Sequence, residues 1–578
     1  MKQIEIADTF DRIADLLELK GENPFRIRAY RRAALNLRGL TEDLEAVTKA
    51  GTLEQIPGIG KDLAAKILEM ISSGRLEFLE KLKKEVPEAL ATLMTIPGIG
   101  PKTAKLVYDR FKVKSPQELE RLVKSRKLRV LPGFQQKKEE NILRGIQLVK
   151  AGQERMTLGA AVRLSEEIFV YLKKVKGIKR ISVAGSLRRR KETVRDIDIL
   201  ITSTTPAQVM DRFVRLSLAA QVQAHGKTKS SIRTRQGVQV DLRVVEPDSF
   251  GAALVYFTGS KEHNIKIRSL ANRMGLTVNE YGVFRQKSGK RVAGREEEDI
   301  YKALGLSWVP PELREDRGEV EAAAQGSLPR LVEWKDIRGS FHNHSTWSDG
   351  HHPVEQVAEA VKAKGYRYML LSDHSKSLRV ARGLSEADLI KQMEQVRVLN
   401  KKMKPFKILM GTEVDILPDG RLDYSDDVLR KLDMVIAAVH SSFKQPKEVM
   451  TARVTKAIRN RYVSILAHPT GRLLGEREAY EIDMEEICRV AARTKTALEI
   501  NCYTQRLDLN DVHAKMAREA GARLVVSTDT HSLDQLDSMD LGLAMARRAW
   551  SGPADVINTM DLEHLQAWVS EKRGESKG

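Results

Sequence analysis

Cysteine is almost absent from this chain, whose 578 residues include only Cys488 and Cys502. This scarcity excludes a disulfide framework and a cysteine-rich zinc module, and it suits a reducing cytoplasm. The chain also lacks an apolar run long enough to span a bilayer. Its opening, MKQIEIADTF, has no basic-plus-apolar leader. We therefore expect a cytoplasmic protein that makes no contact with a membrane.

Acidic residues are too few to balance the basic ones. The formal net charge is +20, from 98 Lys and Arg against 78 Asp and Glu, and residues 1–340 carry +19 of it. Clustered Lys and Arg release counterions from phosphates on binding, so a surface for a polyanion, most simply nucleic acid, is expected in the first half. The alternative is charge that serves only solubility, which the lopsided split disfavours.

The chain is too long for one hydrophobic core, and its sequence pattern divides it. Residues 1–150 have a mostly helical pattern, and residues 178–250 contain short β-branched strands. Residues 331–578 alternate strand-like runs with helical segments, which favours an α/β domain. Between them, PELREDRGEVEAAAQGSLPR (311–330) is charged, Pro-flanked and without an apolar period, so we expect a linker there.

A short unit repeats in the helical region. IPGIGKDLAAKIL (56–68) recurs as IPGIGPKTAKLVY (96–108), and LPGFQQKKEENIL (131–143) is a weaker third copy with Gln135 in place of the second glycine. Two glycines allow a tight turn that presents backbone N–H groups to a phosphate at a helix N-terminus, without reading bases. One copy could be a plain turn between helices, but two near-identical copies in a basic context resemble helix-hairpin-helix DNA-binding motifs. The candidate DNA-binding glycines are Gly58, Gly60, Gly98 and Gly100.

Acidic residues lie in two of the strands expected after the helical region. The segment 178–203, IKRISVAGSLRRRKETVRDIDILITS, contains a strand that ends in a Gly-Ser pair and a second strand, DIDILITS. Alternation along a strand puts Asp196 and Asp198 on one face. A third strand, VQVDLRVVE (238–246), contributes Asp241. Three neighbouring carboxylates repel one another unless cations lie between them, which fits two magnesium ions; a lone D-x-D pair would otherwise be a solvated strand edge.

The Gly-Ser turn, the D-x-D pair and the third aspartate together resemble the nucleotidyltransferase signature of the DNA polymerase beta superfamily. The stretch YFTGSKEHNIKIRSLA (256–271) resembles the part of family X DNA polymerases that lies under the nucleotide sugar and the minor groove. By this resemblance Asp196, Asp198 and Asp241 bind Mg²⁺ or Mn²⁺, and Gly185, Ser186 and Arg189 contact the incoming triphosphate. It further implies that Tyr256 and Phe257 flank a deoxyribose, Gly259 lies at a bend, Asn264 contacts the base edge, and Arg268 reaches the template.

The N-terminal segment is similar to the small lyase domain of family X. Lys66 falls where that family has a Schiff-base lysine, which could attack the aldehyde of an abasic sugar when deprotonated. Arg26 and Tyr30 fit the 5′-phosphate pocket of the family, but Asp62 replaces a basic residue beside the first PGIG and weakens that pocket. Lys66 is therefore either a lyase nucleophile or a surface helix lysine.

After residue 331, apolar runs repeatedly end in residue types that bind metals. Seven runs, each followed by a helical stretch, favour a parallel barrel whose strand ends converge on one site. Six of the chain's 12 histidines belong to this set, too many for satisfied core histidines. ALEINC (497–502) is a run without an obvious ligand. The candidate ligands are His342, His344, Asp349, His374, Glu413, His440, His468, Asp529 and His531.

This pattern, beginning with HNHSTWSDG, resembles the PHP (polymerase and histidinol phosphatase) domain over roughly residues 335–578. The ligand set of nitrogen and oxygen without cysteine points to manganese, zinc or iron rather than magnesium alone. The resemblance implies three ions, Mn²⁺ or Zn²⁺, with Glu413 bridging two of them, and a metal-bound hydroxide that attacks a phosphoester. His351 and His352 match no ligand position, and we expect them at the rim of the site or on the surface.

We therefore expect a multidomain α+β and α/β enzyme of the family X polymerase type with a C-terminal PHP domain. Its activities would be gap-filling DNA synthesis, 3′–5′ exonuclease, and AP endonuclease or 3′-phosphatase in base excision repair. It would act as a monomer on gapped or nicked DNA and deoxynucleoside triphosphates. The rivals are a template-independent nucleotidyltransferase, a small-molecule phosphatase fused to a DNA-binding arm, and a non-catalytic gap-binding protein. The expected domains are a lyase-like helix-hairpin-helix domain (1–85), fingers (86–150), a palm (151–250), a thumb (251–312), a linker (313–332) and a distorted (β/α)7 PHP barrel (333–578).

Overall fold

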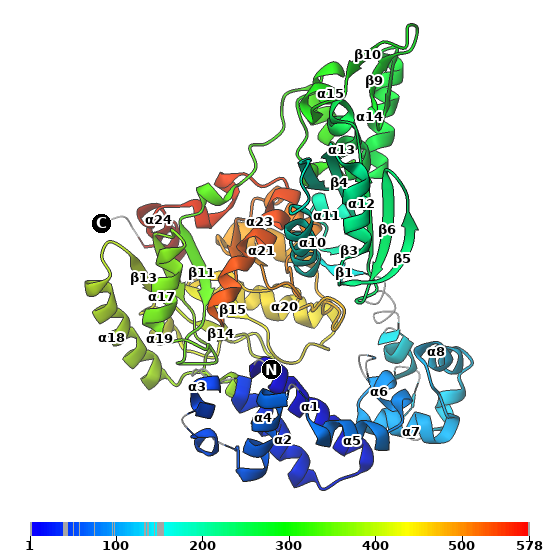
Figure 1. Cartoon of the computed structure of the whole chain (residues 1–578). Helices are drawn as coiled ribbons and strands as arrows, with labels where there is room; N and C mark the ends of the chain where they lie inside the picture. The colour runs from blue at the N-terminus through cyan, green and yellow to red at the C-terminus, as the bar shows by residue number, and fades with distance from the viewer. Residues whose placement is uncertain are drawn as a thin grey trace. The chain divides into compact units, whose positions relative to one another are not determined.

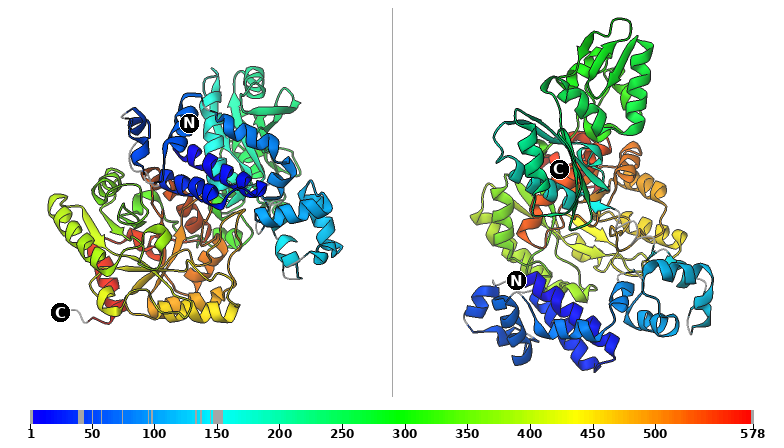
Figure 2. Two further views of the ribbon diagram at one scale, coloured as in Figure 1. Left: turned by 90° about the horizontal axis from the view of Figure 1, so that it is seen from below. Right: turned by 45° about the vertical axis from the view of Figure 1, so that its right-hand side comes forward.

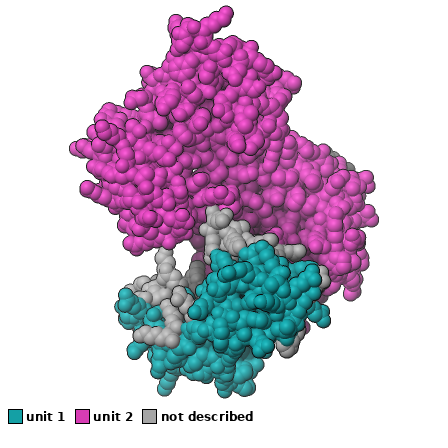
Figure 3. All heavy atoms as spheres, turned by 90° about the vertical axis from the view of Figure 1, so that its right-hand side faces the viewer, with its two compact units in different colours: residues 1–152, 475–477 teal, residues 153–474, 478–578 magenta. Residues whose placement is uncertain are grey.

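The structure is a computed structural model of the whole chain. It describes residues 3–38, 44–49, 51–56, 58–73, 75–94, 96, 99–131, 134–135, 138–143, 145–146 and 155–575. The chain forms two compact units, residues 1–152 with 475–477 and residues 153–474 with 478–578 (Figure 3). Among the described residues, no helix combines the length and the apolar character that a membrane crossing requires.

The first unit is helical, as the sequence pattern predicts. In its first helix Ile6, Phe10, Ile13 and Leu17 follow the helical period, and all four are fully buried in one shared core. Proline opens three of the helices, where its missing N–H needs no partner. The elements are α1 (Gln3–Lys20), α2 (Pro24–Arg38), α3 (Leu44–Lys49), η1 (Leu53–Gln55), α4 (Lys61–Ser73), α5 (Glu77–Glu85), α6 (Glu88–Met94), α7 (Pro101–Phe111), α8 (Pro116–Lys124) and η2 (Lys127–Val130).

The second unit begins with a five-stranded sheet in the order β2-β4-β7-β6-β5. Alternate residues of β4 face opposite sides: Ile197 and Ile199 pack with α10 and α12, whereas Leu200 packs with α13. β4 and β7 pair in parallel, and the other pairs are antiparallel. The elements are β1 (Met156–Thr157), α10 (Leu158–Leu172), β2 (Ile178–Val183), α11 (Gly185–Arg188), β3 (Thr193–Val194), β4 (Asp196–Ser203), α12 (Pro206–Val214), β5 (Ala219–His225), β6 (Lys229–Thr234) and β7 (Gln239–Val244).

The next region, from η3 to α16, has its own small core and includes the segment expected as a linker. Within that segment Arg314 and Glu319 are fully buried, and Leu313 and Val320 belong to the core. Arg314 Nη1 donates to Glu297 Oε1 at 2.7 Å, so charge pairing holds a segment that lacks an apolar period. The elements are η3 (Pro247–Ser249), α13 (Phe250–Thr258), α14 (Lys261–Arg273), β8 (Leu276–Asn279), β9 (Gly282–Arg285), β10 (Arg291–Ala293), α15 (Glu297–Ala303), η4 (Pro311–Leu313) and α16 (Glu319–Ala324).

The C-terminal part contains only parallel strands in its two sheets, β11-β12-β13 and β14-β15-β16-β17-β18. Parallel bridges join the sheets at Asn343–Thr530 and His374–Glu413. One face of the strands, including Phe341, lines a shared apolar interior with residues from both sheets, and helices cover the outside (Figures 1 and 2). The strands are β11 (Gly339–Asn343), β12 (Tyr368–Leu371), β13 (Lys407–Met410), β14 (Glu413–Asp415), β15 (Val435–Ala438), β16 (Val463–Leu466), β17 (Ala497–Asn501) and β18 (Leu524–Ser527).

The helices of this part follow the strands along the chain, as in a strand-helix repeat. Because every strand runs in the same direction, all carboxyl ends lie at one end of the domain, where loop residues can converge. The helices are α17 (Val354–Ala363), α18 (Glu386–Lys402), α19 (Asp426–Leu429), α20 (Lys447–Ile458), α21 (Met484–Thr494), α22 (Asp511–Glu519), α23 (Met539–Arg548) and α24 (Leu562–Arg573).

Candidate active sites

The three predicted palm carboxylates lie on the paired strands β4 and β7. The register places Asp198 opposite Asp241, with Asp196 two residues away on the same face. Burial, together with the neighbouring charges of Asp196 and Asp241, raises the pKa of Asp198 to about 6. Gln239 Nε2 donates to Asp241 Oδ1 at 3.0 Å. A set of carboxylates that repel one another in this way is suited to bind divalent cations.

The Gly-Ser turn approaches these carboxylates closely. Gly185 has a φ of +61°, and a Cβ there would lie 2.6 Å from Asp198 Oδ2, so only glycine fits. Ser186 follows in α11 and is half-buried. Arg189, directly after α11, donates from Nε to Glu315 Oε1 at 3.0 Å and from Nη1 to the carbonyl oxygen of Thr258. Gly185 therefore lies beside the carboxylates, and Ser186 and Arg189 follow it along the chain.

The residues predicted to lie under the nucleotide occupy the end of α13 and the start of α14. Tyr256 is 37% exposed, and its ring centroid lies 5.1 Å from that of Phe257. Gly259 ends α13 with a φ of +68°, in agreement with the predicted bend. Asn264 Nδ2 donates to the Tyr256 carbonyl at 2.7 Å, and Arg268 Nε donates to the Asn264 carbonyl at 3.3 Å. These contacts link Tyr256 to Phe257 and, through Asn264, to Arg268.

The repeated glycine turns of the helical unit have matching backbone geometry. In the first copy the N–H of Ile59 donates to the Ile56 carbonyl at 3.0 Å, and in the second Ile99 donates to Ile96 at the same distance. A Cβ at Gly60 or Gly100 would meet nothing within 4 Å, so the backbone there is open to a ligand. Gly58 has a φ of +79° at its turn, and Gly98 lies outside the described residues.

Lys66 lies on α4 and faces an acidic neighbour one turn earlier. Its Nζ donates to Asp62 Oδ1 and lies 5.2 Å from the centroid of the Phe78 ring. The Lys66 side chain is 12% exposed. Tyr30, expected in the phosphate pocket, is buried and stacks on the same Phe78 ring. The contact with Asp62 therefore occupies the Lys66 amine that the lyase reaction would need as its nucleophile.

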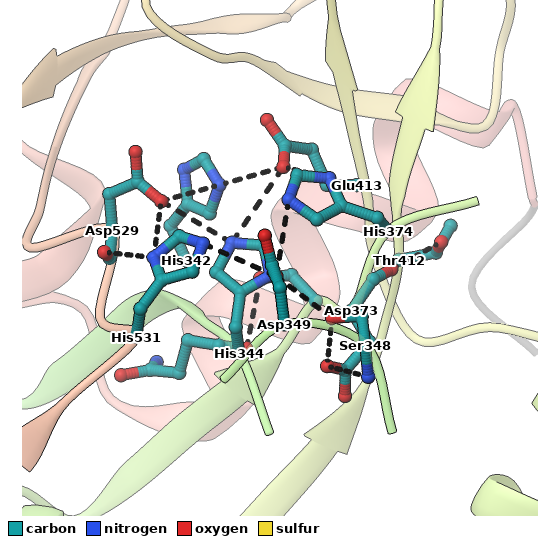
Figure 4. Close-up of polar contacts among 12 residues, drawn as sticks. His342, His344, Ser348, Asp349, Asp373, His374, Thr412, Glu413, Asp529 and His531 are labelled. Atoms are coloured by element: carbon teal, nitrogen blue, oxygen red, sulfur yellow. Dashed lines mark hydrogen bonds and ion pairs between the residues drawn. The ribbon is translucent and has the colours of Figure 1, made fainter. Parts of the chain in front are cut away.

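The nine predicted ligands of the C-terminal part come together, most of them at or just after the carboxyl end of a strand, with Glu413 at the start of β14. Figure 4 labels His342, His344, Asp349, His374, Glu413, Asp529 and His531 among them. Glu413 lies among the histidines: its Oε2 is 2.8 Å from His374 Nδ1 and 3.3 Å from His342 Nε2. Its Oε1 lies 3.0 Å from His468 Nε2 and 3.3 Å from His440 Nε2. Two further close pairs are His344 Nε2–Asp529 Oδ1 at 3.3 Å and His531 Nε2–Asp349 Oδ1 at 3.3 Å.

Several potential ligand atoms of this cluster are buried and lack a hydrogen-bond partner, which fits metal binding. His342 Nε2, both ring nitrogens of His344, His374 Nδ1 and Glu413 Oε2 are buried without a hydrogen-bond partner. Buried polar atoms are rarely left unpaired unless a ligand satisfies them. Three groups have ligand atoms close enough to share one ion: His344, Asp349, His374 and His531; His342, His344 and Asp529; and His374, Glu413 and His440.

The electrostatics differ from one residue of the cluster to the next. Burial alone would raise the pKa of Glu413, but His374, His342 and His440 outweigh it and hold that pKa well below its usual value. Burial, together with the neighbouring histidines His531 and His374, lowers the pKa of His344 to about 4. Nearby carboxylates outweigh burial at two other histidines: Glu413 and Asp415 raise the pKa of His440 to about 10, and Asp349 and Asp529 raise that of His531 to about 9. These two imidazoles must therefore each release a proton when a divalent metal binds them.

Two buried carboxylates behind the ligands were not predicted. Glu499, in the run that had no obvious ligand, accepts from His342 Nδ1 at 2.6 Å and is fully buried. Asp415 accepts from His440 Nδ1. Each orients an imidazole so that its other nitrogen faces the cluster. Strand alternation could have indicated Asp415, which lies two residues after Glu413 and on the same face.

Four known protein families match parts of this chain. Residues 253–315 match the DNA polymerase beta thumb family, and residues 340–503 match the PHP domain family. Residues 1–76 match a helix-hairpin-helix domain, and residues 90–147 match a SAM-like helix-hairpin-helix tandem.

Individual proteins are similar to the whole chain or to one half. The DNA polymerase/3′-5′ exonuclease PolX of Bacillus subtilis (strain 168) is 40% identical over 98% of this chain and 99% of its own length. A protein named "Probable phosphatase" from Thermoanaerobacter sp. (strain X514) is 29% identical over 40% of this chain and 94% of its own length. DNA polymerase lambda of Rattus norvegicus is 24% identical over 54% of this chain and 56% of its own length.

Proposed function

The chain belongs to the family X DNA polymerases that carry a C-terminal PHP domain, and from this premise we propose that it fills short gaps in DNA and shortens DNA 3′ ends. The observation that carries the proposal is that one chain has two separate clusters of side chains of the types that bind divalent metals: the aspartates on β4 and β7, and the histidine-rich cluster of the C-terminal part. Base excision repair is the process that needs both activities. Divalent cations bound at each cluster would supply Lewis acidity at the phosphorus that is attacked.

In the polymerase half, the chain's own residues would bind and orient the substrates. Asp196, Asp198 and Asp241 would hold Mg²⁺ or Mn²⁺ between the primer end and the nucleotide. Ser186 and Arg189 would bind the triphosphate through charge-assisted hydrogen bonds, with the Gly185 backbone alongside. Tyr256 and Phe257, at the Gly259 bend, would contact the deoxyribose. Asn264 would contact the base edge, and Arg268 would contact the template.

The helical unit would hold the gapped or nicked DNA by its phosphates. The open backbone at Gly60 and Gly100 supports this role, since such turns bind phosphate without reading bases. We assign residues 1–85 to a lyase-like domain and 86–150 to fingers. Lys66 would act as a lyase nucleophile only in molecules where its pair with Asp62 is open.

In the PHP half, the nine-residue cluster would hold three ions, Mn²⁺ or Zn²⁺. We propose 3′–5′ exonuclease as its main activity, with AP endonuclease and 3′-phosphatase as further activities. The phosphatase activity has separate support, because the relative named a phosphatase aligns over 94% of its length within this chain. A monomer in the cytoplasm is sufficient for these reactions.

One assay tests the proposal on a gapped duplex with a 5′-labelled primer. With Mn²⁺ and deoxynucleotides the wild-type enzyme should extend the primer, and without deoxynucleotides it should shorten it. Asp196→Ala should abolish extension and leave shortening, and His342→Ala combined with His344→Ala should do the reverse. Loss of both activities in either folded variant would contradict the two-site assignment.

The same assay tests the rival function, a template-independent nucleotidyltransferase fused to a small-molecule phosphatase. That enzyme would add nucleotides to a single-stranded primer as readily as to a gapped one. It would also hydrolyse a free phosphomonoester and leave DNA ends intact. Template-directed addition, with each of the four bases in the gap selecting its complement, would reject it.

A further inference from the structure

A buried arginine of the PHP half contacts the proposed triphosphate residue of the polymerase half. Arg548 is the last residue of α23 and is 2% exposed. Its Nη1 donates to the carbonyl oxygen of Arg189 at 2.7 Å and to Glu315 Oε1 at 3.0 Å, and its Nη2 donates to Asp511 Oδ2 at 2.7 Å. A buried guanidinium requires this many partners, because an unpaired charge there would be strongly destabilising.

Glu315 transmits this contact to the Arg189 side chain. The same oxygen, Glu315 Oε1, accepts from Arg548 Nη1 and from Arg189 Nε, both at 3.0 Å. Arg189 Nη1 donates to the carbonyl oxygen of Thr258, so two N–H groups of its guanidinium are already held by protein. A guanidinium has five N–H donors, and the others remain for a phosphate. The carboxylate therefore sets the direction in which Arg189 presents them.

The charge on Glu315 is stable at neutral pH. Burial alone would raise its pKa, but Arg548 and Arg189 outweigh the effect of burial, with a smaller contribution from Lys191, and they hold the pKa below its usual value. Glu315 belongs to the segment after η4, which is packed against α23. Apart from Asp511, the partners of Arg548 are Arg189, Glu315 and the Glu312 carbonyl, which accepts from its Nη1 at 3.4 Å, and all three precede the PHP half.

The neighbouring residue provides an internal comparison. Arg547 makes an ion pair across the same boundary, with Nε donating to Glu312 Oε1 at 2.8 Å and Nη1 to the Val332 carbonyl at 3.1 Å. It supports the packing of α23 against the residue 312 region, whereas Arg548 contacts Arg189 and its carboxylate. A general loss of interface stability would affect both arginines alike.

We propose that Arg548 is a positioning residue for nucleotide addition: through Glu315 and the Arg189 backbone it fixes Arg189 for the triphosphate, so that the PHP half sets the affinity of the polymerase half for deoxynucleotides. This inference rests on the proposed role of Arg189 in triphosphate binding. Without Arg548, Glu315 keeps only one arginine partner, and the Arg189 carbonyl oxygen loses a hydrogen-bond donor. The Arg189 guanidinium then samples more orientations before the nucleotide binds.

Steady-state insertion of one nucleotide into a one-nucleotide gap tests the inference in the full-length enzyme. Arg548→Met should raise KM for the deoxynucleotide about tenfold, which corresponds to about 1.4 kcal/mol of binding. The kcat should stay within about threefold, since no group that touches the reacting atoms is removed. Arg548→Lys, which keeps a charge but not the planar fork, should give a smaller rise in KM.

Two controls separate positioning from folding. Arg547→Met, in the same interface, should leave KM within about twofold, and both variants should keep wild-type exonuclease activity on single-stranded 3′ ends. If Arg548→Met fails to fold, Glu315→Gln tests the same link with little change of volume, and it should also raise KM selectively.

The inference is overturned if Arg547→Met raises KM as much as Arg548→Met, or if Arg548→Met and Glu315→Gln leave KM unchanged. Arg189→Met serves as the reference for the proposed function. If Arg189→Met does not raise KM, the triphosphate role itself is wrong. If it does and the Arg548 and Glu315 variants do not, only the positioning role is wrong.

Discussion

Replacement of Glu499 by glutamine should weaken metal binding in the PHP half, although Glu499 is not itself a proposed ligand. Each carboxylate oxygen of Glu499 accepts from two donors. Oε1 accepts from His342 Nδ1 at 2.6 Å and from Ser527 Oγ, and Oε2 accepts from the His468 N–H at 2.6 Å and from Asn501 Nδ2 at 3.2 Å. A glutamine side chain has the same shape, but it has only one acceptor oxygen and must turn its NH₂ group toward one of these pairs.

The two possible orientations have different consequences. An NH₂ group toward the His468 side leaves two buried donors unsatisfied, at about 1–3 kcal/mol each. An NH₂ group toward the His342 side costs less folding free energy, because the Ser527 hydroxyl can rotate and His342 can move its proton from Nδ1 to Nε2. That tautomer removes the lone pair of Nε2, the nitrogen that lies 3.3 Å from Glu413 Oε2. We therefore expect metal affinity to fall about 10- to 100-fold, as is typical for such orienting partners.

Metal content and activity on the same preparations measure this effect. Exonuclease rate is titrated with Mn²⁺, and the apparent midpoint should rise by the same 10- to 100-fold factor. At saturating Mn²⁺ the rate should recover much of its wild-type value, because the nine ligands are intact. Primer extension in the gap assay serves as the internal control and should not change. An unchanged Mn²⁺ midpoint for Glu499→Gln, with the glutamine folded in place, would refute the reasoning.

Three further predictions follow from single contacts. Asp198→Asn should raise the melting temperature of the metal-free protein at pH 8: its pKa of about 6 exceeds the ordinary 3.8, so the folded state binds the proton more tightly. The free energy of unfolding therefore falls as pH rises from 3.8 to about 6, by on the order of 3 kcal/mol in total. The stability gained with asparagine should accordingly shrink toward pH 5. Gly185→Ala should lower gap filling more than about 100-fold, roughly 2.7 kcal/mol, and leave exonuclease intact, because a Cβ would lie 2.6 Å from an Asp198 carboxylate oxygen; equal extension rates would contradict this. Asp62→Asn should increase borohydride trapping on a 5′-deoxyribose phosphate severalfold by releasing the Lys66 amine, and Lys66→Ala should abolish it; trapping that persists without Lys66 would assign the lyase elsewhere.

Local periodicity predicted much of both sites. Alternation along DIDILITS correctly placed Asp196 and Asp198 on one face, and the parallel register brings Asp241 opposite Asp198. The apolar runs that end in histidine or acid were predicted to be parallel strands with a common carboxyl end, and their ligands do converge. These predictions succeed because a strand of period two and the direction of a parallel sheet are properties of short segments.

Longer-range pairing limited the rest. The 311–330 segment was expected to be a linker because it is charged and has no apolar period, yet Arg314 and Glu319 are buried within the thumb core. Arg314 is buried because Glu297 pairs with it, and His263 pairs with Glu319 at 2.6 Å. The sequence pattern of a segment does not contain the partner that makes its charge tolerable inside a core.

The amino-acid sequence alone determined the residue types of the two metal-binding clusters, their order along the chain and the strands that present them. Only the tertiary structure decided which side chains hydrogen-bond to the site residues: Glu499 accepts from His342, and Arg548 donates to the Arg189 carbonyl. Periodicity is a property of residues that are close in sequence, whereas these partners lie 157 and 359 positions apart. A contact at such separation exists only once the intervening chain has folded, so no local pattern predicts it.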